Sequence, residues 1–524
     1  MKFSNPLKSS AHSLPSPDGK HVATLFSSVV NVRDLHNLEV INVIKLPQDF
    51  TGPVLGFRWS PSSQLLLVAG PEQVRVASAL DNSFHATIRT TTVPGTKPAY
   101  IGFGASDTEI CVVSSFGLKF AVFDLASSKA AEIANPKVFS PSSTASRCFS
   151  FRPQTRHLAL LTRVAGKDMI SIHSFPTREL QRSFAPDTID AQGLTWSPDG
   201  RWLVVWDSAA QGHRVIFYTS DGHLFKTWSG PANPSHEDRD FALGAGVKVL
   251  QFSPDARYLA IGDSSRAVCV FSMASVTEAI RLRHPKTLAP TESFQVWQEQ
   301  ISVPHAGPVV HSFLRTTQII SPAPRLQDNS EPVSGCAVIS FDPSSALVAT
   351  RLEDSPGTIW IWDVQAAQLR GVLLFHGNIS ALSWHPHIPG TLLIRCEGDQ
   401  YNGMVFVWDH LSEGPRSVDF NQHLPGFKTN GKPRSSWLGL DIASAPSLFF
   451  SDAHNYMLAC LTESDQVQPP WGGQASLEPG YVAETREESP LELVPAGEAG
   501  PDAANFTEDE GEYSELEDTF VHKR

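Results

Sequence analysis

A short phrase of apolar and polar positions recurs along this chain. Each copy begins with an apolar residue, continues with Ser-Pro or a close variant and a few polar residues, and ends in an apolar run. The apolar runs are short, are bounded by turn-forming residues and show little helical periodicity, which predicts β-strands. The clearest copies begin at Pro15, Trp59, Trp196 and Phe252, and weaker ones at Phe103, Phe151, Phe341, Trp384 and Phe450.

The spacing of these copies predicts a repeat fold. Most neighbouring copies lie 43 to 48 residues apart, which fits the roughly 40–45 residues of a four-stranded propeller blade. Three longer steps indicate insertions at 229–241, 285–335 and 413–436. The Pro-rich stretch at 285–335 fits either a further blade or a long surface loop. We therefore expect an all-β propeller of nine or ten four-stranded blades, arranged as one large ring or as two smaller rings.

Trp-Asp dipeptides indicate the type of propeller. Trp362-Asp363 and Trp408-Asp409 each close a β-rich run and precede a polar turn. An aromatic residue at a strand end can be buried against the next blade, while the aspartate can hydrogen-bond the backbone of the turn. This dipeptide names the WD40 repeat, so we predict a WD40-type propeller. The residues expected to anchor its repeats are Trp59, Trp196, Phe252, Trp362, Asp363, Trp384, Trp408 and Asp409.

The formal charge of −13 is confined to the end of the chain. Residues 463–524 hold 16 Asp and Glu but only 3 Lys and Arg, and the remaining residues are balanced. A neutral body gives no electrostatic reason to expect nucleic-acid binding. The final segment is rich in Pro, Gly, Ala and Glu and cannot bury enough apolar surface to offset its chain entropy. We therefore expect a propeller region at 1–462 and a disordered acidic tail at 463–524.

Cysteine usage and hydropathy indicate the compartment. The six cysteines lie far apart and form no C-x-x-C pair, which favours a reducing environment over a disulfide framework or a zinc site. The first residues lack the apolar stretch of a secretory signal. No run approaches the roughly 18 apolar residues that a membrane-spanning helix needs. A soluble intracellular protein without a membrane partner is expected.

Sequence motifs give little support for catalysis. Gly102 and Gly104 lack the third glycine and the following helix of a nucleotide-binding loop. The only tight histidine pair, His385 and His387, stands where other copies have Ser-Pro, which favours a turn over a metal site. We predict no catalytic, metal-binding or cofactor-binding residue, and no cofactor. Ser489, which precedes a proline in the tail, is the most accessible candidate for phosphorylation.

Four apolar residues stand out in the acidic tail. Phe506, Tyr513, Leu516 and Phe520 follow one another at spacings of 7, 3 and 4 among seven acidic residues. This spacing would place them on one face of a helix, as in segments that fold on binding a partner. They are candidate partner-binding residues. The alternative is a solvated acidic tail with incidental aromatic residues.

The order of the blades resembles one family of WD-repeat proteins. The stretches that carry the resemblance are 1–4, 16–20, 32–34, 203–207, 217–222, 252–262, 284–285 and 296–299. The strongest match is Leu347-Val348-Ala349-Thr350-Arg351, followed by Ile359-Trp360-Ile361-Trp362-Asp363-Val364-Gln365. Over residues 1–460 the chain is similar to the centrosomal and spindle-pole-body WD-repeat proteins. The acidic tail lies outside this resemblance.

Membership of that family would imply a non-enzymatic scaffold. Its implied partners are a coiled-coil microtubule-anchoring protein, other pole components and, in fungi, a minus-end-directed kinesin. Such a complex anchors microtubule minus ends and supports spindle organisation. The implied location is the cytoplasm and cytoskeleton, at the spindle pole body or centrosome. The resemblance assigns no binding residues, so we expect partners at surface loops, including at least one of the three insertions.

Two other kinds of propeller remain open as alternatives. A translation-initiation propeller can also have nine blades, but it would favour a basic RNA-binding extension where this chain is acidic. A substrate receptor of a ubiquitin ligase usually has Arg two residues after the Trp-Asp dipeptide. Gln365 and Leu411 occupy that position after the two dipeptides here. Both alternatives are therefore less well supported than the pole scaffold.

Overall fold

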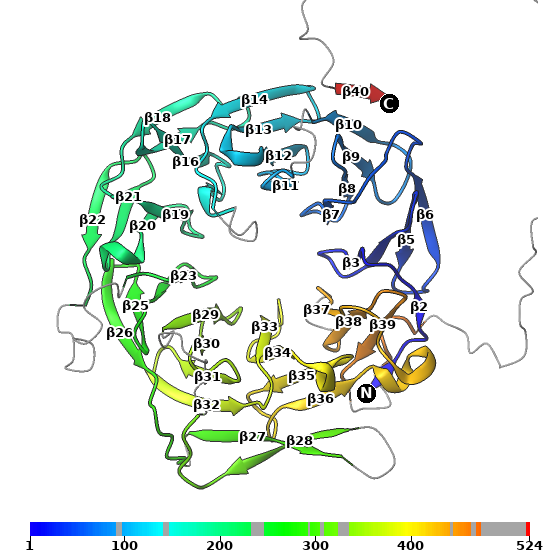
Figure 1. The fold of residues 1–524 in the computed structure, drawn as a ribbon, viewed down its shortest axis with the longest axis vertical. Helices are drawn as coiled ribbons and strands as arrows, with labels where there is room; N and C mark the ends of the chain where they lie inside the picture. Colours follow the sequence, from blue (N-terminus) through cyan, green and yellow to red (C-terminus); the bar gives the residue numbers. More distant parts are fainter. Residues whose placement is uncertain are drawn as a thin grey trace, which may run out of the picture.

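Nine β-sheets stand around a central axis in the computed structural model (Figure 1). The structure describes residues 1–90, 97–139, 146–231, 246–291, 294–303, 309–322, 335–440, 444–462 and 468–472, together with the backbone of 520–523. Over these residues each sheet is one blade with an antiparallel four-stranded core, and the blades follow one another around a single ring. The prediction of an all-β propeller is confirmed, with nine blades in one ring.

The first three blades are formed by consecutive strands, numbered from the centre outwards. Blade 1 contains β3 (Ser13–Pro15), β4 (His21–Leu25), β5 (Val29–Asp34) and β6 (Val40–Lys45). Blade 2 contains β7 (Gly56–Trp59), β8 (Leu65–Ala69), β9 (Gln73–Ser78) and β10 (His85–Arg89), with β40 (Phe520–Lys523) as a fifth strand. Blade 3 contains β11 (Tyr100–Phe103), β12 (Glu109–Val113), β13 (Lys119–Asp124) and β14 (Lys129–Ala134).

Blades 4 to 6 repeat the same arrangement. Blade 4 contains β15 (Phe149–Phe151), β16 (Leu158–Val164), β17 (Lys167–His173) and β18 (Leu180–Phe184). Blade 5 contains β19 (Ala191–Trp196), β20 (Trp202–Asp207), β21 (Val215–Thr219) and β22 (Leu224–Trp228). Blade 6 contains β23 (Val249–Phe252), β24 (Tyr258–Gly262), β25 (Ala267–Ser272) and β26 (Thr277–Arg283).

Blades 7 and 8 follow. Blade 7 contains β29 (Cys336–Phe341), β30 (Leu347–Leu352), β31 (Thr358–Asp363) and β32 (Gln368–Leu374), extended outwards by β27 (Gln295–Ser302) and β28 (Val310–Thr316). Blade 8 contains β33 (Ile379–Trp384), β34 (Thr391–Cys396), β35 (Met404–Asp409) and β36 (Arg416–Asp419). The short 3-10 helices are η1 (Ser115–Gly117), η3 (Ala209–Gln211), η4 (Asp399–Tyr401), η5 (Asn421–His423) and η6 (Pro425–Phe427).

Blade 9 joins the two ends of the propeller. Its inner strands β37 (Arg434–Trp437), β38 (Ser447–Ser451) and β39 (Asn455–Cys460) come from the end of the ring, whereas β1 (Lys2–Phe3) and β2 (Leu7–Lys8) come from its start. Lys2 pairs with Cys460 and Leu7 pairs with Tyr456, both in antiparallel register. The ring is thus closed by backbone hydrogen bonds between its first and last strands.

The insertion at 285–335 does not form a tenth blade. It supplies the hairpin β27–β28, whose first strand runs parallel to β32, with Val296 opposite Val372. The two strands therefore lie outside the fourth strand of blade 7, at the periphery of the ring (Figure 1). This position decides between the two interpretations of the insertion: part of it is a sheet extension on the outer surface.

The Ser-Pro phrase forms the turn between the first and second strands of a blade. In blade 5 the Ser197 hydroxyl accepts the Trp202 N–H at 3.0 Å and donates to the Asp199 carboxylate at 2.5 Å. Gly200 in the same turn has a φ of +68°, a left-handed conformation that glycine adopts without strain. The phrase thus satisfies turn hydrogen bonds beside a buried strand.

The prediction that a copy of the phrase begins at Phe450 is wrong. This residue lies in β38, the second strand of blade 9, whereas the aromatic residue at the end of the inner strand is Trp437. The Trp437 indole N–H donates to the Ser383 carbonyl of blade 8 at 2.8 Å. Trp384 and Trp59 make the same type of bond to the preceding blade, at 2.9 and 3.0 Å. Indole hydrogen bonds and buried apolar contacts therefore join neighbouring blades.

A buried chain of hydrogen bonds links blades 6 and 7. The Trp362 indole donates to the Thr350 hydroxyl at 3.0 Å, and that hydroxyl lies 2.7 Å from Nε2 of His284. Nδ1 of His284 donates to the Arg266 carbonyl at 2.8 Å. Because His284 is only 4% exposed, burial lowers its pKa from 6.5 to about 3. The imidazole is therefore neutral at physiological pH.

A buried ion pair joins blades 3 and 4. The Arg178 guanidinium donates to both carboxylate oxygens of Glu109, at 2.9 and 2.6 Å, and also to the Arg156 carbonyl at 2.7 Å. Both side chains of the pair are buried. A two-point contact of this kind also fixes the orientation of the partners.

Candidate partner-binding surface

The repeat anchors lie inside the ring. The aromatic side chains of Trp59, Trp196, Phe252, Trp362, Trp384 and Trp408 are all buried. The Asp363 carboxylate accepts the Ala366 N–H at 2.9 Å, and the Asp409 carboxylate accepts the Leu411 N–H at 2.7 Å. These residues shape the blades and their turns, so a partner must contact other residues.

The candidate residues of the tail are only partly described. Phe506, Tyr513 and Leu516 lie outside the described residues, as does Ser489. Phe520 lies in the strand β40, so the expected helical face does not extend to it. A strand forms here because Phe520–Lys523 pairs with the edge of β10. The spacing of apolar residues in the tail carries no sign of this distant partner. The role of these residues in partner binding remains a prediction.

The three predicted insertions differ in what they form. Residues 232–241 of the first lie outside the described part of the chain. The insertion at 413–436 supplies the outer strand β36 and the helices η5 and η6. The insertion at 285–335 supplies the β27–β28 hairpin, which extends the sheet of blade 7 outwards.

The β27–β28 hairpin exposes aliphatic side chains at its outer edge. Val310 and Leu314 on β28 are 51% and 60% exposed, and Val303 and Ile319 beside the hairpin are more exposed still. The strand β28 has no further strand on its outer side in the described sheet. Exposed aliphatic residues on an open strand edge are a common feature of protein-binding surfaces.

A buried polar cluster fixes the hairpin to the ring. The Glu299 carboxylate on β27 accepts hydrogen bonds from Nδ1 of His311 at 2.6 Å, the Tyr401 hydroxyl at 2.8 Å and the His376 N–H at 2.7 Å. Burial alone would raise the pKa of Glu299, but these hydrogen bonds outweigh burial and lower it. The hairpin is therefore anchored to blades 7 and 8 by an ionised carboxylate.

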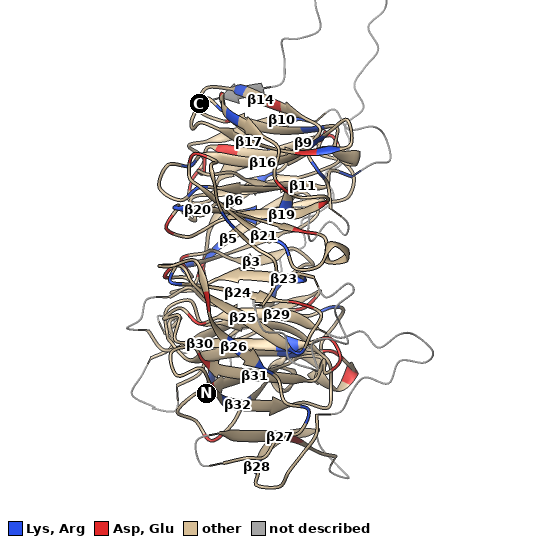
Figure 2. Ribbon diagram, turned by 90° about the vertical axis from the view of Figure 1, so that its left-hand side faces the viewer, with Lys and Arg blue, Asp and Glu red and all other residues tan. Residues whose placement is uncertain are grey.

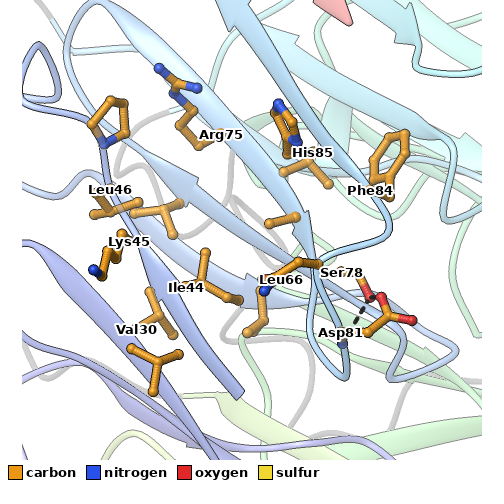
Figure 3. Close-up of a pocket in the computed structure, with 16 residues that line it drawn as sticks. Val30, Ile44, Lys45, Leu46, Leu66, Arg75, Ser78, Asp81, Phe84 and His85 are labelled. Carbon is orange, nitrogen blue, oxygen red and sulfur yellow. Dashed lines mark hydrogen bonds between the residues drawn. The ribbon is translucent and has the colours of Figure 1, made fainter. Parts of the chain in front are cut away.

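A second apolar surface lies between the outer strands of blades 1 and 2. We call it the blade 1–2 groove; it has a volume of about 530 Å³. Figure 3 shows side chains from both blades facing this space. Its aliphatic lining includes Val30, Val43, Ile44, Leu46, Leu66 and Val68. The groove is accessible from outside, since Val43 on β6 is 45% exposed.

Charged groups stand around the groove. Arg75 pairs with Asp49 at 3.6 Å, and Lys45 lies on the same rim. Asp81 lies in the turn between β9 and β10, where hydrogen bonds from Ser78 and Ser83 lower its pKa to about 2. Asp81 is therefore ionised at physiological pH.

Neither charge dominates the side of the ring drawn in Figure 2. Figure 2 shows Lys and Arg interspersed with Asp and Glu along the blades. Among the described residues, no three histidine, cysteine or acidic side chains are grouped as metal ligands, and no helix is long and apolar enough to cross a membrane. Each of the six cysteines has a free thiol. The β27–β28 hairpin edge and the blade 1–2 groove are therefore the candidate partner-binding surfaces.

Similarity to known proteins agrees with this fold. The chain is 25% identical over 415 residues to the WD repeat-containing protein WRAP73 of Mus musculus, covering 75% of this chain and 83% of that protein. It is 24% identical over 390 residues to an uncharacterised WD repeat-containing protein of Schizosaccharomyces pombe, covering 72% of this chain and 74% of the relative. The predicted resemblance to WD-repeat proteins is confirmed. No protein-family model matches the chain.

A solved structure shares the architecture. The crystal structure of a eukaryotic initiation factor matches 80% of this chain and 90% of its own chain with a TM-score of 0.50. The two sequences are 11% identical. This likeness concerns the fold alone, because one propeller architecture serves many unrelated functions.

Proposed function

We propose that this protein is a non-catalytic scaffold of the spindle pole body or centrosome. It anchors microtubule minus ends in the cytoskeleton together with a coiled-coil anchoring protein, a minus-end-directed kinesin and other pole components. Support comes from the order of idiosyncratic blade sequences over residues 1–460 and from the similarity to WD repeat-containing proteins across most of the chain.

The observation that carries the scaffold role is the pair of separate apolar surfaces on one closed ring. The β27–β28 hairpin extends blade 7, whereas the blade 1–2 groove lies in a different part of the ring (Figure 1). A propeller is rigid, so it can hold two protein partners in a constant relative position. The hairpin exposes aliphatic side chains and the groove is lined by them, which suits protein partners better than nucleic acid.

The experiment is live imaging and affinity purification of the tagged full chain from dividing cells. We expect the protein at spindle poles and recovery of coiled-coil and kinesin partners. The variant Leu314→Glu alters the hairpin edge, and Leu180→Glu is its matched control, since Leu180 is 58% exposed on the outer strand of blade 4. Partner recovery should fall for the first variant only. Absence from the poles would overturn the assignment, and equal recovery would overturn the role of the hairpin.

The ribosomal alternative can be separated in the same cells. Co-sedimentation of the tagged chain with ribosomal subunits on sucrose gradients would support an initiation function and contradict the pole scaffold. We expect the protein to remain in the light fractions, because charges of both signs are interspersed in Figure 2 and RNA binding draws on a basic surface. The ubiquitin-ligase alternative would instead predict recovery of ligase subunits in the purification.

A further inference from the structure

The outer edge of blade 2 is already occupied by a strand from the end of the chain. The backbone of β40 pairs with β10 in antiparallel register, with Phe520 opposite Ile88 and Lys523 opposite His85. Some 430 residues of sequence separate the two strands. Four consecutive pairs show that the outer edge of β10 can pair with an extended segment, which here is β40. Strand addition of this kind is an established mode of peptide recognition.

The edge of β10 and the blade 1–2 groove form one continuous surface. His85 begins β10 and also lines the groove, and Phe84 lines it one residue earlier. A segment paired with β10 therefore reaches the groove at its His85 end, where the groove is also lined by Ile44 of blade 1 (Figure 3). Backbone pairing would supply affinity for any extended chain, and the groove would select apolar side chains.

The charges near the two ends of β10 are opposite in sign to those of the chain segment that pairs with it. Basic residues end the sequence at His522, Lys523 and Arg524, and β40 meets β10 at His85, four residues after the Asp81 carboxylate. The opposite end of β10 carries Arg89, and the sequence before β40 is acidic, as in Glu517 and Asp518. An antiparallel segment with acidic residues first and basic residues last is therefore complementary to the edge.

We propose that β10 and the blade 1–2 groove form a strand-addition site for an extended partner peptide. Its chemistry is an acidic stretch, then an apolar pair, then basic residues, and the chain's own β40 occupies the β10 edge of the site until such a segment displaces it. This inference concerns binding by the isolated protein, and it stands whether or not the protein acts at spindle poles.

The test measures binding of a fluorescent peptide with the sequence of residues 511–524 to the purified full chain. The variant Val521→Pro removes a backbone donor from β40 and should free the edge of β10, while Thr507→Pro is a matched proline control in the tail. We expect binding to the Val521→Pro chain to be at least about tenfold tighter than to the natural chain or the control, because a resident strand lowers the competent fraction. A scrambled peptide should not bind.

A second variant tests the groove. Val43→Asp, added to the Val521→Pro chain, should weaken peptide binding at least about fivefold by placing a charge in the apolar lining, and Leu180→Asp should not. Thermal melting confirms that each variant is folded. Equal binding by the natural and Val521→Pro chains would overturn the resident role of β40. No effect of Val43→Asp would overturn the groove, and a dimer that dissociates in the Val521→Pro chain would show that β40 pairs between two copies instead.

Discussion

The buried histidine between blades 6 and 7 should make the stability of the propeller depend on pH. His284 has a pKa of about 3 in the folded chain, while an unfolded histidine titrates near 6.5. Below pH 6.5 the unfolded state binds a proton that the folded state does not, so the free energy of unfolding falls as the pH drops towards 3. The stabilisation is fully present above pH 6.5.

The magnitude follows from the difference between pH and the unfolded pKa. At pH 5.0 the loss from His284 alone is about 2 kcal/mol, or 1.5 units at about 1.36 kcal/mol each. The structural reason is burial: His284 is only 4% exposed, and its two ring nitrogens contact the Arg266 carbonyl and the Thr350 hydroxyl, neither of which carries a negative charge to stabilise an imidazolium.

The assay is urea unfolding of the full chain at pH 7.5 and pH 5.0, compared with the variant His284→Gln. The variant should be less stable at both pH values. The change in its free energy of unfolding between pH 7.5 and pH 5.0, compared with the change in the natural chain, isolates the titration of His284. The natural chain should lose about 2 kcal/mol more than the variant. His454→Gln, at an exposed histidine, should leave the difference unchanged. Equal losses in the natural and His284→Gln chains would refute the reasoning.

Three further substitutions test the buried polar contacts. Thr350→Val leaves two buried groups unpaired and should lower the free energy of unfolding by about 2–3 kcal/mol in urea titrations, with a much smaller effect for Thr358→Val on the adjacent strand. Arg178→Met leaves the Glu109 carboxylate buried and should lower it by about 3–5 kcal/mol; if the added substitution Glu109→Gln restores none of this, the ion-pair explanation is wrong. Glu299→Gln should speed amide hydrogen exchange in β27 and β28 about tenfold, since a lost charged hydrogen bond is worth at least about 1.4 kcal/mol; unchanged exchange would contradict the anchoring role of the cluster.

The ring could be predicted because its signals are local. Each Ser-Pro turn satisfies its own hydrogen bonds within about five residues, as Ser197, Asp199 and Trp202 do. The Trp-Asp dipeptides likewise act on the turn that follows them. Local chemistry of this kind appears in the sequence as a period, and the period indicates the number of blades. The ninth copy was misplaced because Phe450-Ser451-Asp452 imitates the phrase, while the true inner strand ends at Trp437 without a Ser-Pro turn.

The candidate surfaces depend on contacts that are distant in sequence. The parallel pairing of β27 with β32 and the pairing of β40 with β10 leave no local pattern, because a strand edge accepts many sequences through its backbone. One usable signal was present for the groove. β6 has the sequence Val-Ile-Asn-Val-Ile-Lys, with four aliphatic residues in an outer strand, where solvent contact would favour polar residues.

The closure of blade 9 also bears on synthesis at the ribosome. β1 and β2 are among the first residues made, yet their partner β39 ends at Cys460. At about 5–20 residues per second, roughly 20–90 seconds pass before β39 can leave the ribosome. During that interval the edges of the first and the newest blade are both unpaired, which exposes them to wrong strand pairing. The nascent chain is therefore most in need of chaperones until its last blade is made, and a truncated product would keep both edges open permanently.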